Sequence, residues 1–381
     1  MSRLGWTARI VTGAGALALL VACGAPPERG AEGKDGGGTG AKAARATDVG
    51  AMGGLDALVE AAKAEGQLNV IALPPDWANY GTMIKTFSQK YGIKVDSAQP
   101  DAASQDEINA AKQLKGTKRA PDVFDLGLSV ALANTELFAP YQVQTWGDIP
   151  DELKEPSGRW VSDYGGYMSI GYDAGKAPAP KQVSDLLGPK YKGKVALNGD
   201  PTQAGSAFNG VVAASLGNGG SADDIDPGVE FFGKLKKAGN FLPVDPTPAT
   251  VESGQTPVVF DWDYLNAAQG EQLEGKVDWQ VVIPENAVVG SYYVQAINKD
   301  APHPAAARLW QEFLYSDEGQ NIWLNGFARP VRAEAMEKAG TIDTAAYAKL
   351  PKVPGKPVYL TPEQTEAASK YLAEHWARAV K

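Results

Sequence analysis

Two short segments of the chain combine aromatic rings with carboxylates at places where a strand is expected to end. They are Asp76-Trp-Ala-Asn-Tyr80 and Phe260-Asp-Trp-Asp-Tyr264. An aromatic face attracts an organic cation by ~0.5–2 kcal/mol, and a carboxylate withdrawn from water needs a positive partner. The chemistry that these residue types suit is therefore non-covalent capture of an ammonium-bearing molecule. The candidate ligand contacts are Asp76, Trp77, Asn79, Tyr80, Asp261, Trp262, Asp263 and Tyr264.

A structural interpretation competes with this one in both segments. Tyr80 also falls on the apolar face of the helix expected to follow it, and Asp76 or Asn79 can cap that helix. In the second segment one aspartate can cap the next helix while Trp262 packs beneath it. Both interpretations stay open at this stage.

Three further places carry candidate ligand contacts. In Gly290-Ser-Tyr-Tyr293, alternation along a strand puts Tyr292 and Tyr293 on opposite faces, so only one of them can face a given cleft. The segment from Asn198 to Ser206 leads from a strand end into a helix, where free N–H groups can hold an anionic or carbonyl oxygen. The hydroxyl groups beside those N–H groups belong to Thr202 and Ser206, which can equally act as caps. Ser129 is the weakest candidate, because it can simply cap the next helix.

Alternating strands and helices are expected to position these segments. The predicted strands cover 67–73, 93–95, 122–126, 194–197, 256–260, 279–283 and 292–297. The predicted helices cover 55–66, 80–92, 104–114, 184–187, 206–216, 227–238 and 304–314. Ser104-Gln-Asp-Glu107 has the spacing of a capping box at the start of the third helix. Such alternation with short loops predicts an α/β fold with a mixed, mostly parallel sheet flanked by helices.

Composition excludes several classes of function. A net charge of -9 with a pI near 5.0 argues against nucleic-acid binding. The 381 residues contain only two histidines, His303 and His375. This small number disfavours a histidine-rich metal site and a histidine-based catalytic triad. Gly127-Leu-Ser-Val-Ala131 lacks the last glycine of a nucleophile elbow, so a secreted hydrolase is disfavoured. We expect no catalytic residues, no metal and no cofactor.

The N-terminus has the layout of a secretory signal. Residues 1–22 contain Arg3 and Arg9 followed by an apolar run that is too short to span a membrane. Leu20-Val-Ala-Cys23 resembles a bacterial lipobox, and Cys23 is the only cysteine in the sequence. We expect a lipid on Cys23 that holds the protein at the outer face of the cytoplasmic membrane. Residues 23–54 are rich in Gly and Ala and are predicted to be a flexible tether.

A family resemblance emerges from several stretches taken in order. They are Ala62-Lys-Ala-Glu-Gly66, Phe87-Ser-Gln-Lys-Tyr-Gly-Ile-Lys-Val95, Ala120-Pro-Asp-Val123, Leu187-Gly-Pro-Lys-Tyr-Lys-Gly-Lys-Val195, Asp300-Ala-Pro-His-Pro304, Tyr315-Ser-Asp-Glu-Gly-Gln320 and Arg329-Pro-Val-Arg332. Together they resemble the solute-binding proteins of ABC importers with the type II periplasmic-binding-protein fold. The resemblance is closest to the branch with polyamine-, ferric-ion-, thiamine- and phosphonate-binding members.

This resemblance implies a two-lobed receptor that closes by a hinge over a small polar ligand. One lobe would comprise 55–168 plus 289–325, and the other 169–288 plus 326–381, with crossover strands between them. It implies a monomer that delivers its ligand to an ABC permease, with membrane contact through the lipid alone. Ligand-facing residues of such a fold belong in loops at the carboxyl ends of strands.

The resemblance also bears on the kind of ligand. The Trp77-x-x-Tyr80 spacing is similar to a motif whose aromatics face the ligand in polyamine-binding members, and Trp262 matches another ligand-contacting tryptophan. Tyr293, however, stands where that pattern has an aspartate, which leaves a smaller or singly charged amine plausible. Ferric-ion members normally carry two adjacent tyrosines, whereas this chain has Tyr264-Leu265 there. The expectation is a cationic organic solute, with ferric-ion, phosphonate or thiamine binding as alternatives.

Overall fold

The structure is a computed structural model that describes residues 36–380. The predicted signal segment, residues 1–22, and the predicted lipidation site at Cys23 lie outside the described residues. Among the helices in residues 36–380, none combines the length and apolar character needed to cross a bilayer.

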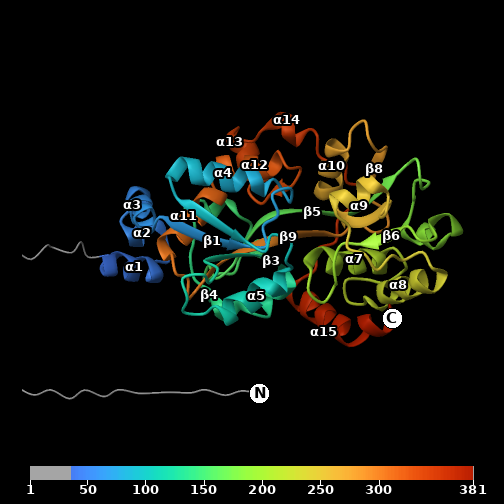
Figure 1. The fold of residues 1–381 in the computed structure, drawn as a ribbon, viewed down its shortest axis with the longest axis horizontal. Helices are drawn as coiled ribbons and strands as arrows, with labels where there is room; N and C mark the ends of the chain where they lie inside the picture. The colour runs from blue at the N-terminus through green and yellow to red at the C-terminus, as the bar shows by residue number, and fades with distance from the viewer. Residues whose placement is uncertain (1–35, 381) are drawn as a thin grey trace, which may run out of the picture. The chain divides into compact units, whose positions relative to one another are not determined.

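The core of the fold is a mixed sheet with helices packed around it (Figure 1). Its main strand order is β3-β9-β5-β7-β6, with β4 beside β9 and with β8 and β10 beside β5, while β1 and β2 form a separate parallel pair. The strands are β1 Gln67–Ile71, β2 Lys94–Ala98, β3 Val123–Gly127, β4 Phe138–Ala139, β5 Val161–Asp173, β6 Val195–Leu197, β7 Val258–Trp262, β8 Trp279–Val282, β9 Gly290–Asn298 and β10 Arg329–Pro330.

Strand β5 joins the two sides of the molecule. Its first residues pair with β9 and β10, and its residues from Met168 onward pair with β7 and β8. We call the elements around β1–β4, β9 and β10 the β3 side and those around β6–β8 the β7 side; they lie to the left and right in Figure 1. The predicted α/β fold with a mixed sheet is confirmed. Its pairing is more antiparallel than expected. Strand β9 runs antiparallel to β3 and β5, and β5 runs antiparallel to β7; the described ladders are parallel only in β1–β2 and β6–β7.

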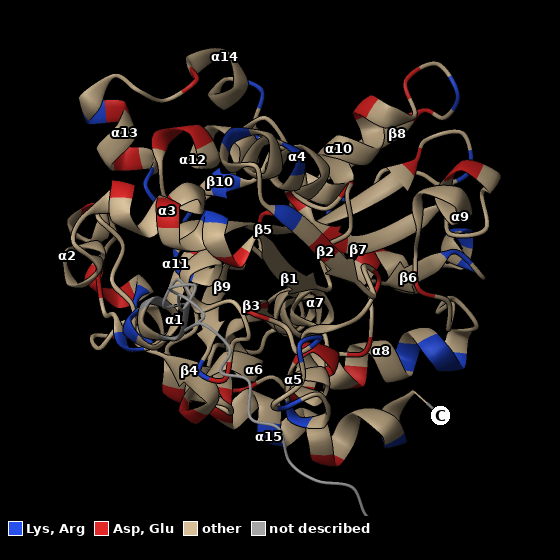
Figure 2. Ribbon diagram, turned by 60° about the vertical axis from the view of Figure 1, so that its left-hand side comes forward, with Lys and Arg blue, Asp and Glu red and all other residues tan. Residues whose placement is uncertain are grey.

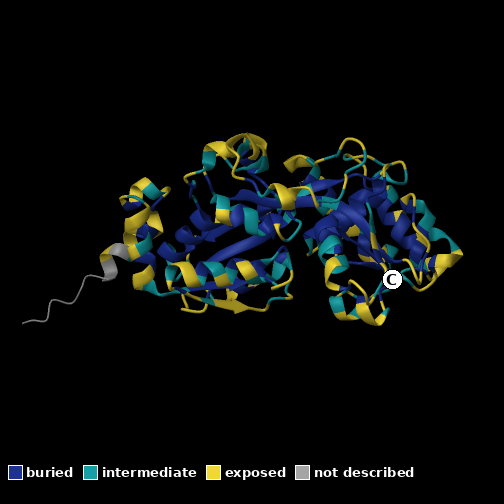
Figure 3. Cartoon of the chain, turned by 90° about the horizontal axis from the view of Figure 1, so that it is seen from above, coloured by how far each residue is buried: buried dark blue, intermediate teal, exposed yellow. Residues whose placement is uncertain are grey.

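The helices cover both sides of the sheet with amphipathic faces (Figure 3). They are α1 Gly36–Arg45, α2 Val49–Met52, α3 Leu55–Glu65, α4 Tyr80–Tyr91, α5 Ser104–Gln113, α6 Leu128–Leu132, α7 Gly205–Leu216, α8 Asp226–Ala238, α9 Pro248–Ser253, α10 Asp263–Gln272, α11 Pro304–Leu314, α12 Asp317–Leu324, α13 Ala333–Ala339, α14 Thr344–Tyr347 and α15 Pro362–Ala379. Glycines in the left-handed conformation end α3 and α4, as the sequence predicted at Gly66 and Gly92. The predicted capping box at Ser104 is wrong. Ser104 lies inside α5, and its hydroxyl accepts a hydrogen bond from Gly127 N at 3.0 Å.

The described part of the predicted tether, residues 36–54, is not a free linker. It forms α1 and α2, and Ala43, Ala46 and Met52 are buried in the core. The guanidinium of Arg308 donates to Ala46 O at 2.8 Å and to Ala44 O at 3.0 Å. Small alanines let α1 pack closely against α11, so a segment with few large apolar residues still folds onto the β3 side.

The segment after residue 326 does not pack as one unit with the β7 side. Met336, Ile342 and Ala346 form a small cluster with Leu324 of α12. Helix α15 contacts both α6 and α8, and it therefore touches both sides of the molecule. The expected division of the chain at residue 326 does not describe this packing.

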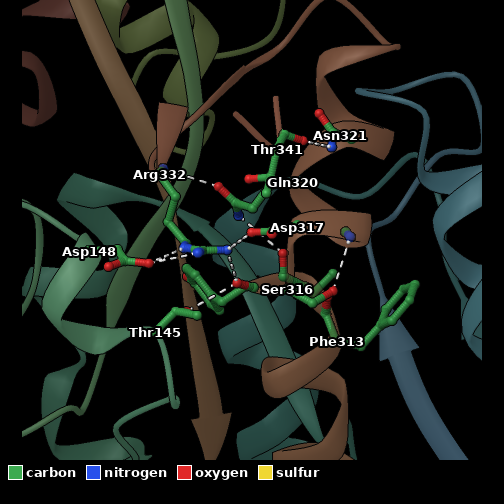
Figure 4. Close-up of polar contacts among 12 residues, drawn as sticks. Thr145, Asp148, Phe313, Ser316, Asp317, Gln320, Asn321, Arg332 and Thr341 are labelled. Atoms are coloured by element: carbon green, nitrogen blue, oxygen red, sulfur yellow. Dashed lines mark hydrogen bonds and ion pairs between the residues drawn. The ribbon is translucent and has the colours of Figure 1, made fainter. Parts of the chain in front are cut away.

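Arg332 fixes the chain after β10 to the β3 side (Figure 4). Its guanidinium donates to Asp148 Oδ2 at 2.6 Å, to Asp317 Oδ1 at 2.9 Å and to Tyr315 O at 2.7 Å. Its backbone N–H donates to Gln320 Oε1 at 3.1 Å. The second arginine of the Arg329-Pro-Val-Arg332 stretch is thus a structural anchor.

Candidate functional site

A cavity of about 590 Å³ lies between the β3 side and the β7 side. The β3 side contributes the loop after β1, the first turn of α5 and Asp125 of β3. The β7 side contributes the loop between β6 and α7, the loop before α9, Asp261 of β7 and one face of α10. Tyr293 of β9 completes the wall. Loops at the carboxyl ends of β1, β2 and β6 therefore form much of the cavity, as the fold class predicts.

The lining of this cavity is acidic. Among the described residues that form it, eight are carboxylates and none is Lys, Arg or His. Figure 2 shows red acidic segments beside β7, whereas blue basic segments lie on outer elements such as α8. None of these eight lining carboxylates takes part in an ion pair of the described residues. The eight are Asp76, Asp101, Asp106, Glu107, Asp125, Asp200, Asp245 and Asp261.

Glu107 and Asp125 form the buried acidic wall of the β3 side. Glu107 is 1% exposed and Asp125 is 6% exposed. Glu107 Oε2 accepts from Asp125 N at 3.1 Å, and Asp125 Oδ2 accepts from the Tyr164 hydroxyl at 2.8 Å. Burial raises the pKa of Asp125 to about 7, and burial together with the neighbouring Asp125 raises the pKa of Glu107 well above its usual value.

Asp261 is the buried carboxylate of the β7 side. Its Oδ2 accepts from Asn198 Nδ2 at 2.8 Å, and its Oδ1 accepts from Trp262 N at 2.8 Å. Burial raises the pKa of Asp261 to about 7, although both hydrogen bonds favour the ionised form. Two neutral donors therefore orient this carboxylate without neutralising it.

Trp77 supplies the aromatic face of the cavity, and a chain of hydrogen bonds holds it. Its Nε1 donates to the Tyr164 hydroxyl at 2.8 Å, and Tyr164 in turn donates to Asp125. The ring of Trp77 meets Tyr293 edge-on at 5.6 Å, and Tyr293 stacks on Tyr164 at 5.6 Å. The indole and the buried carboxylate are thus coupled through one phenol.

The structure brings part of the sequence-predicted set together at this cavity. The residues of that set that line it are Asp76, Trp77, Ser206, Asp261 and Tyr293. Ser206 also donates to Asn198 O at 2.8 Å, so its hydroxyl orients the β6–α7 loop.

Three of the predicted aromatic contacts belong to the core instead. Trp262 is 1% exposed, and Tyr80 and Tyr264 are fully buried. Side chains alternate along β7, so Asp261 faces the cavity and Trp262 points away from it. Trp262 stacks on Tyr264 at 6.1 Å. The Tyr80 hydroxyl accepts from Gln295, so the structural interpretation of Tyr80 is the one that the packing supports.

Three predicted polar contacts form hydrogen bonds or ion pairs with other groups of the protein. Asn79 donates from its amide to Ile322 O at 3.0 Å. Asp263 opens α10, accepts from Tyr167 N at 2.8 Å and pairs with Arg329. The Thr202 hydroxyl donates to Asp200 Oδ1 at 2.6 Å.

Ser129 and Tyr292 lie elsewhere. Both line a second, much smaller cavity of about 60 Å³. The Tyr292 ring stacks on Tyr359 at 6.4 Å, while Tyr293 faces the large cavity. The opposite orientations predicted for the two tyrosines are therefore what the structure shows.

The residues that sequence reasoning missed are mostly acids outside the aromatic segments. Glu107 was assigned to a capping box, and Asp125 to the interior of a strand. Asp101 and Asp245 lie in exposed loops without a motif. Only the three-dimensional convergence of α5 with β3 shows that Glu107 and Asp125 face one cavity. Within the described part of the chain, no group of three or more His, Cys, Asp or Glu side chains is placed to hold a metal ion.

Comparison with known proteins identifies the family. Residues 121–352 match the family model described as bacterial extracellular solute-binding protein. The chain therefore belongs to this family of binding proteins, which capture small solutes outside the cytoplasm and work with ABC permeases; it is a family of transport proteins rather than of enzymes.

Solved structures show the same two-lobed α/β fold. The periplasmic binding protein AfuA from Actinobacillus pleuropneumoniae, with fructose 6-phosphate bound, matches with a TM-score of 0.64 and 20% identity over 82% of this chain and 98% of that chain. Iron-bound HitA from Pseudomonas aeruginosa matches with a TM-score of 0.60 and 20% identity over 82% and 99%. A putative spermidine/putrescine ABC transporter protein from Listeria monocytogenes matches with a TM-score of 0.62 and 14% identity over 82% and 98%. These similarities show the fold alone, because related folds carry unrelated ligands.

Proposed function

We propose that this protein is a receptor for a small organic cation, such as a polyamine or a simpler amine, which it delivers to an ABC permease. The observation that carries the proposal is the lining of the large cavity, where eight carboxylates occur with no basic side chain among the described lining residues. A site of one charge sign raises the local concentration of ligands of the opposite sign. About 590 Å³ is a volume suited to a small solute.

The same lining disfavours an anionic ligand. The N-terminus of α7 offers backbone N–H groups, which by themselves suit a phosphate or carboxylate. Asp200 and Asp261 lie in the same wall, however, and would repel such a group. A phosphonate or sugar phosphate therefore meets unfavourable charge at the very loop that could otherwise bind it.

Ferric iron is also disfavoured by the tyrosines. The alternative required two adjacent phenols at the strand end, but Tyr264 is followed by Leu265 and is fully buried beside Trp262. Burial raises the pKa of Tyr264 well above its usual value, so its phenolate form is strongly disfavoured.

Capture would proceed by closure of the two lobes over the solute. The cavity draws residues from both sides of the molecule, and β5 connects those sides as a hinge strand. Trp77 and Tyr293 would offer ring faces to the cation, and the carboxylates would supply its counter-charge. We further propose that Cys23 carries a lipid that tethers a monomeric receptor to the outer face of the cytoplasmic membrane.

A thermal-shift series matched in carbon skeleton tests the ligand class. The probes are 1,4-diaminobutane, 1-aminobutane, butan-1-ol, fructose 6-phosphate and ferric citrate. We expect the melting temperature to rise with the amines, because a ligand that binds only the folded state stabilises it by mass action. A rise with fructose 6-phosphate or ferric citrate, and none with either amine, would overturn the proposal.

A further inference from the structure

We infer that Glu107 and Asp125 form a subsite for one ammonium group of the solute. This inference rests on the proposed function and adds to it a particular place for positive charge, on the β3 side of the cavity. Neither residue lies in the aromatic segments from which the sequence predicted ligand contacts.

One oxygen of each carboxylate has a close hydrogen-bond partner, and Tyr80 and Gln295 also favour the ionised form of Asp125. Glu107 Oε2 accepts from Asp125 N, and Asp125 Oδ2 accepts from the Tyr164 hydroxyl. The other two oxygens, Glu107 Oε1 and Asp125 Oδ1, are buried and have no hydrogen-bond partner among the described residues. Both residues line the cavity. The protein therefore orients two acceptors in the wall and leaves Glu107 Oε1 without a donor.

A buried acceptor without a donor has lost its hydrogen bonds to water and gained none in return, and the loss is larger when the acceptor is charged. Two buried carboxylates so close together also disfavour each other's ionisation, in line with the raised pKa values of Asp125 and Glu107. An ammonium group has three N–H donors and one positive charge. It can donate to a carboxylate and also neutralise its charge, which no neutral group does.

Two other fully buried carboxylates pair with cations of this chain, whereas Asp163, also fully buried, accepts only from neutral donors, Gln295 Nε2 and the Tyr164 N–H. Asp263 is fully buried and pairs with Arg329. Asp122 is fully buried and lies 2.9 Å from His303 Nδ1. Glu107 and Asp125 have no such partner among the described residues, and they face the cavity rather than the core.

Tyr164 links this subsite to the aromatic wall. The phenol donates to Asp125 and accepts from Trp77 Nε1. An alkylammonium bound to the two carboxylates would lie beside the rings of Trp77 and Tyr293, which contact each other edge-on. The subsite thus suits a primary amine with an apolar chain.

Calorimetric titration of the mature protein with 1,4-diaminobutane and with 1-aminobutane tests the inference. The variants are Glu107→Gln and Asp125→Asn, which keep the shape of each side chain. The matched control is Asp96→Asn, which removes the same charge from an exposed position of β2 outside the cavity lining. The melting temperature of each variant is measured in parallel to show that the variant is folded. The result for either variant alone tests the subsite.

We expect each of the two variants to bind both amines at least about tenfold more weakly than the wild type, which is about 1.4 kcal/mol. The control should stay within about threefold, because exposed charges contribute little. Wild-type affinity in folded Glu107→Gln and Asp125→Asn would overturn the subsite while leaving the proposed function standing. Absence of amine binding to the wild type would instead overturn the proposed function and the subsite with it.

Discussion

Two aspartates on either side of Trp262 have opposite surroundings. Asp263 is fully buried, opens α10 and pairs with Arg329, whose guanidinium also lies 4.6 Å from the centre of the Tyr167 ring. Asp261 is nearly as buried, but its partners are the neutral Asn198 amide and the Trp262 backbone. The chain therefore supplies a cation to the first carboxylate and leaves the second, which faces the cavity, without one. In our proposal, the first carboxylate is balanced by the fold and the second by the ligand.

The largest effect should come from breaking the ion pair of the structural aspartate. Arg329→Met leaves Asp263 buried without its cation, and we expect the free energy of unfolding to fall by about 3–5 kcal/mol. Chemical denaturation measures this loss. The double variant Arg329→Met/Asp263→Asn should recover part of it, because the uncompensated charge is gone. A loss below about 1 kcal/mol in the single variant, the size typical of exposed pairs, would remove the contrast between the two aspartates.

The cavity-facing aspartate should behave in the opposite way. Asp261→Asn should lower the affinity for 1,4-diaminobutane about tenfold or more, since a hydrogen bond to a charged group is worth about 1.5–3 kcal/mol. The same variant should unfold at an equal or higher denaturant concentration, because it removes a carboxylate whose burial is not compensated. Titration and denaturation of one sample report both quantities. A large loss of stability with unchanged affinity would assign Asp261 to the fold and contradict our account.

A smaller effect is expected from loosening the aromatic wall. Trp77→Phe keeps an aromatic ring but removes the Nε1 that donates to Tyr164. We expect amine affinity to fall by about two- to fivefold, equivalent to a net hydrogen bond of ~0.5–1 kcal/mol. Trp146→Phe is the matched control, because Trp146 is also half-buried but lies outside the cavity lining. Equal effects of the two substitutions would show that Trp77 has no special part in binding.

Local sequence patterns predicted most of the fold, because they depend on neighbours along the chain. Helical spacing of apolar residues located α3 and α4, and the apolar run Thr256–Phe260 located β7. The pairing of the strands was harder to predict from the sequence. The long strand β5 pairs with strands on both sides of the molecule, and nothing in its own residues specifies an antiparallel partner. The packing of α1 depends on Arg308, more than 260 positions away, and was therefore missed.

The candidate site was only partly predictable for the same reason. The motif around Trp77 and Asp261 located two walls of the cavity. Trp262 has the residue type and position of a ligand contact, but the direction of β7 points it into the core. Glu107 and Asp125 carry no local signal, since their role depends on α5 meeting β3 and on Tyr164 meeting Asp125.

The central claim is that the buried carboxylates of the cavity receive their counter-charge from the solute. In the empty site, burial raises the pKa values of Asp125 and Asp261 to about 7, so near that pH both carry protons part of the time. Their folded pKa values exceed the unfolded ones. The stability that they contribute is therefore present below about pH 4 and is lost as the pH rises through about 7. Amine affinity should change in the opposite sense and increase over that range, because an ammonium group binds the ionised form.

Other polar and titratable groups surround these two carboxylates and share in the titration. Around Asp125 they are Glu107 of α5, Tyr80 of α4, Asp163 and Tyr164 of β5, Tyr264 of α10, Tyr293 and Gln295 of β9, and Tyr315. Around Asp261 they are Asn198, Tyr264 and Tyr293. None of these groups is a cation, so the direction of the expected pH dependence does not change.

Proton release on binding is the most direct test. Titration of the wild-type protein with 1,4-diaminobutane near pH 7, in two anionic buffers that differ in ionisation enthalpy, counts the protons exchanged. Our account predicts saturable binding with a net release of protons to the buffer, as the cation displaces them from Asp125 and Asp261. Saturable binding with proton uptake or with no exchange would contradict it.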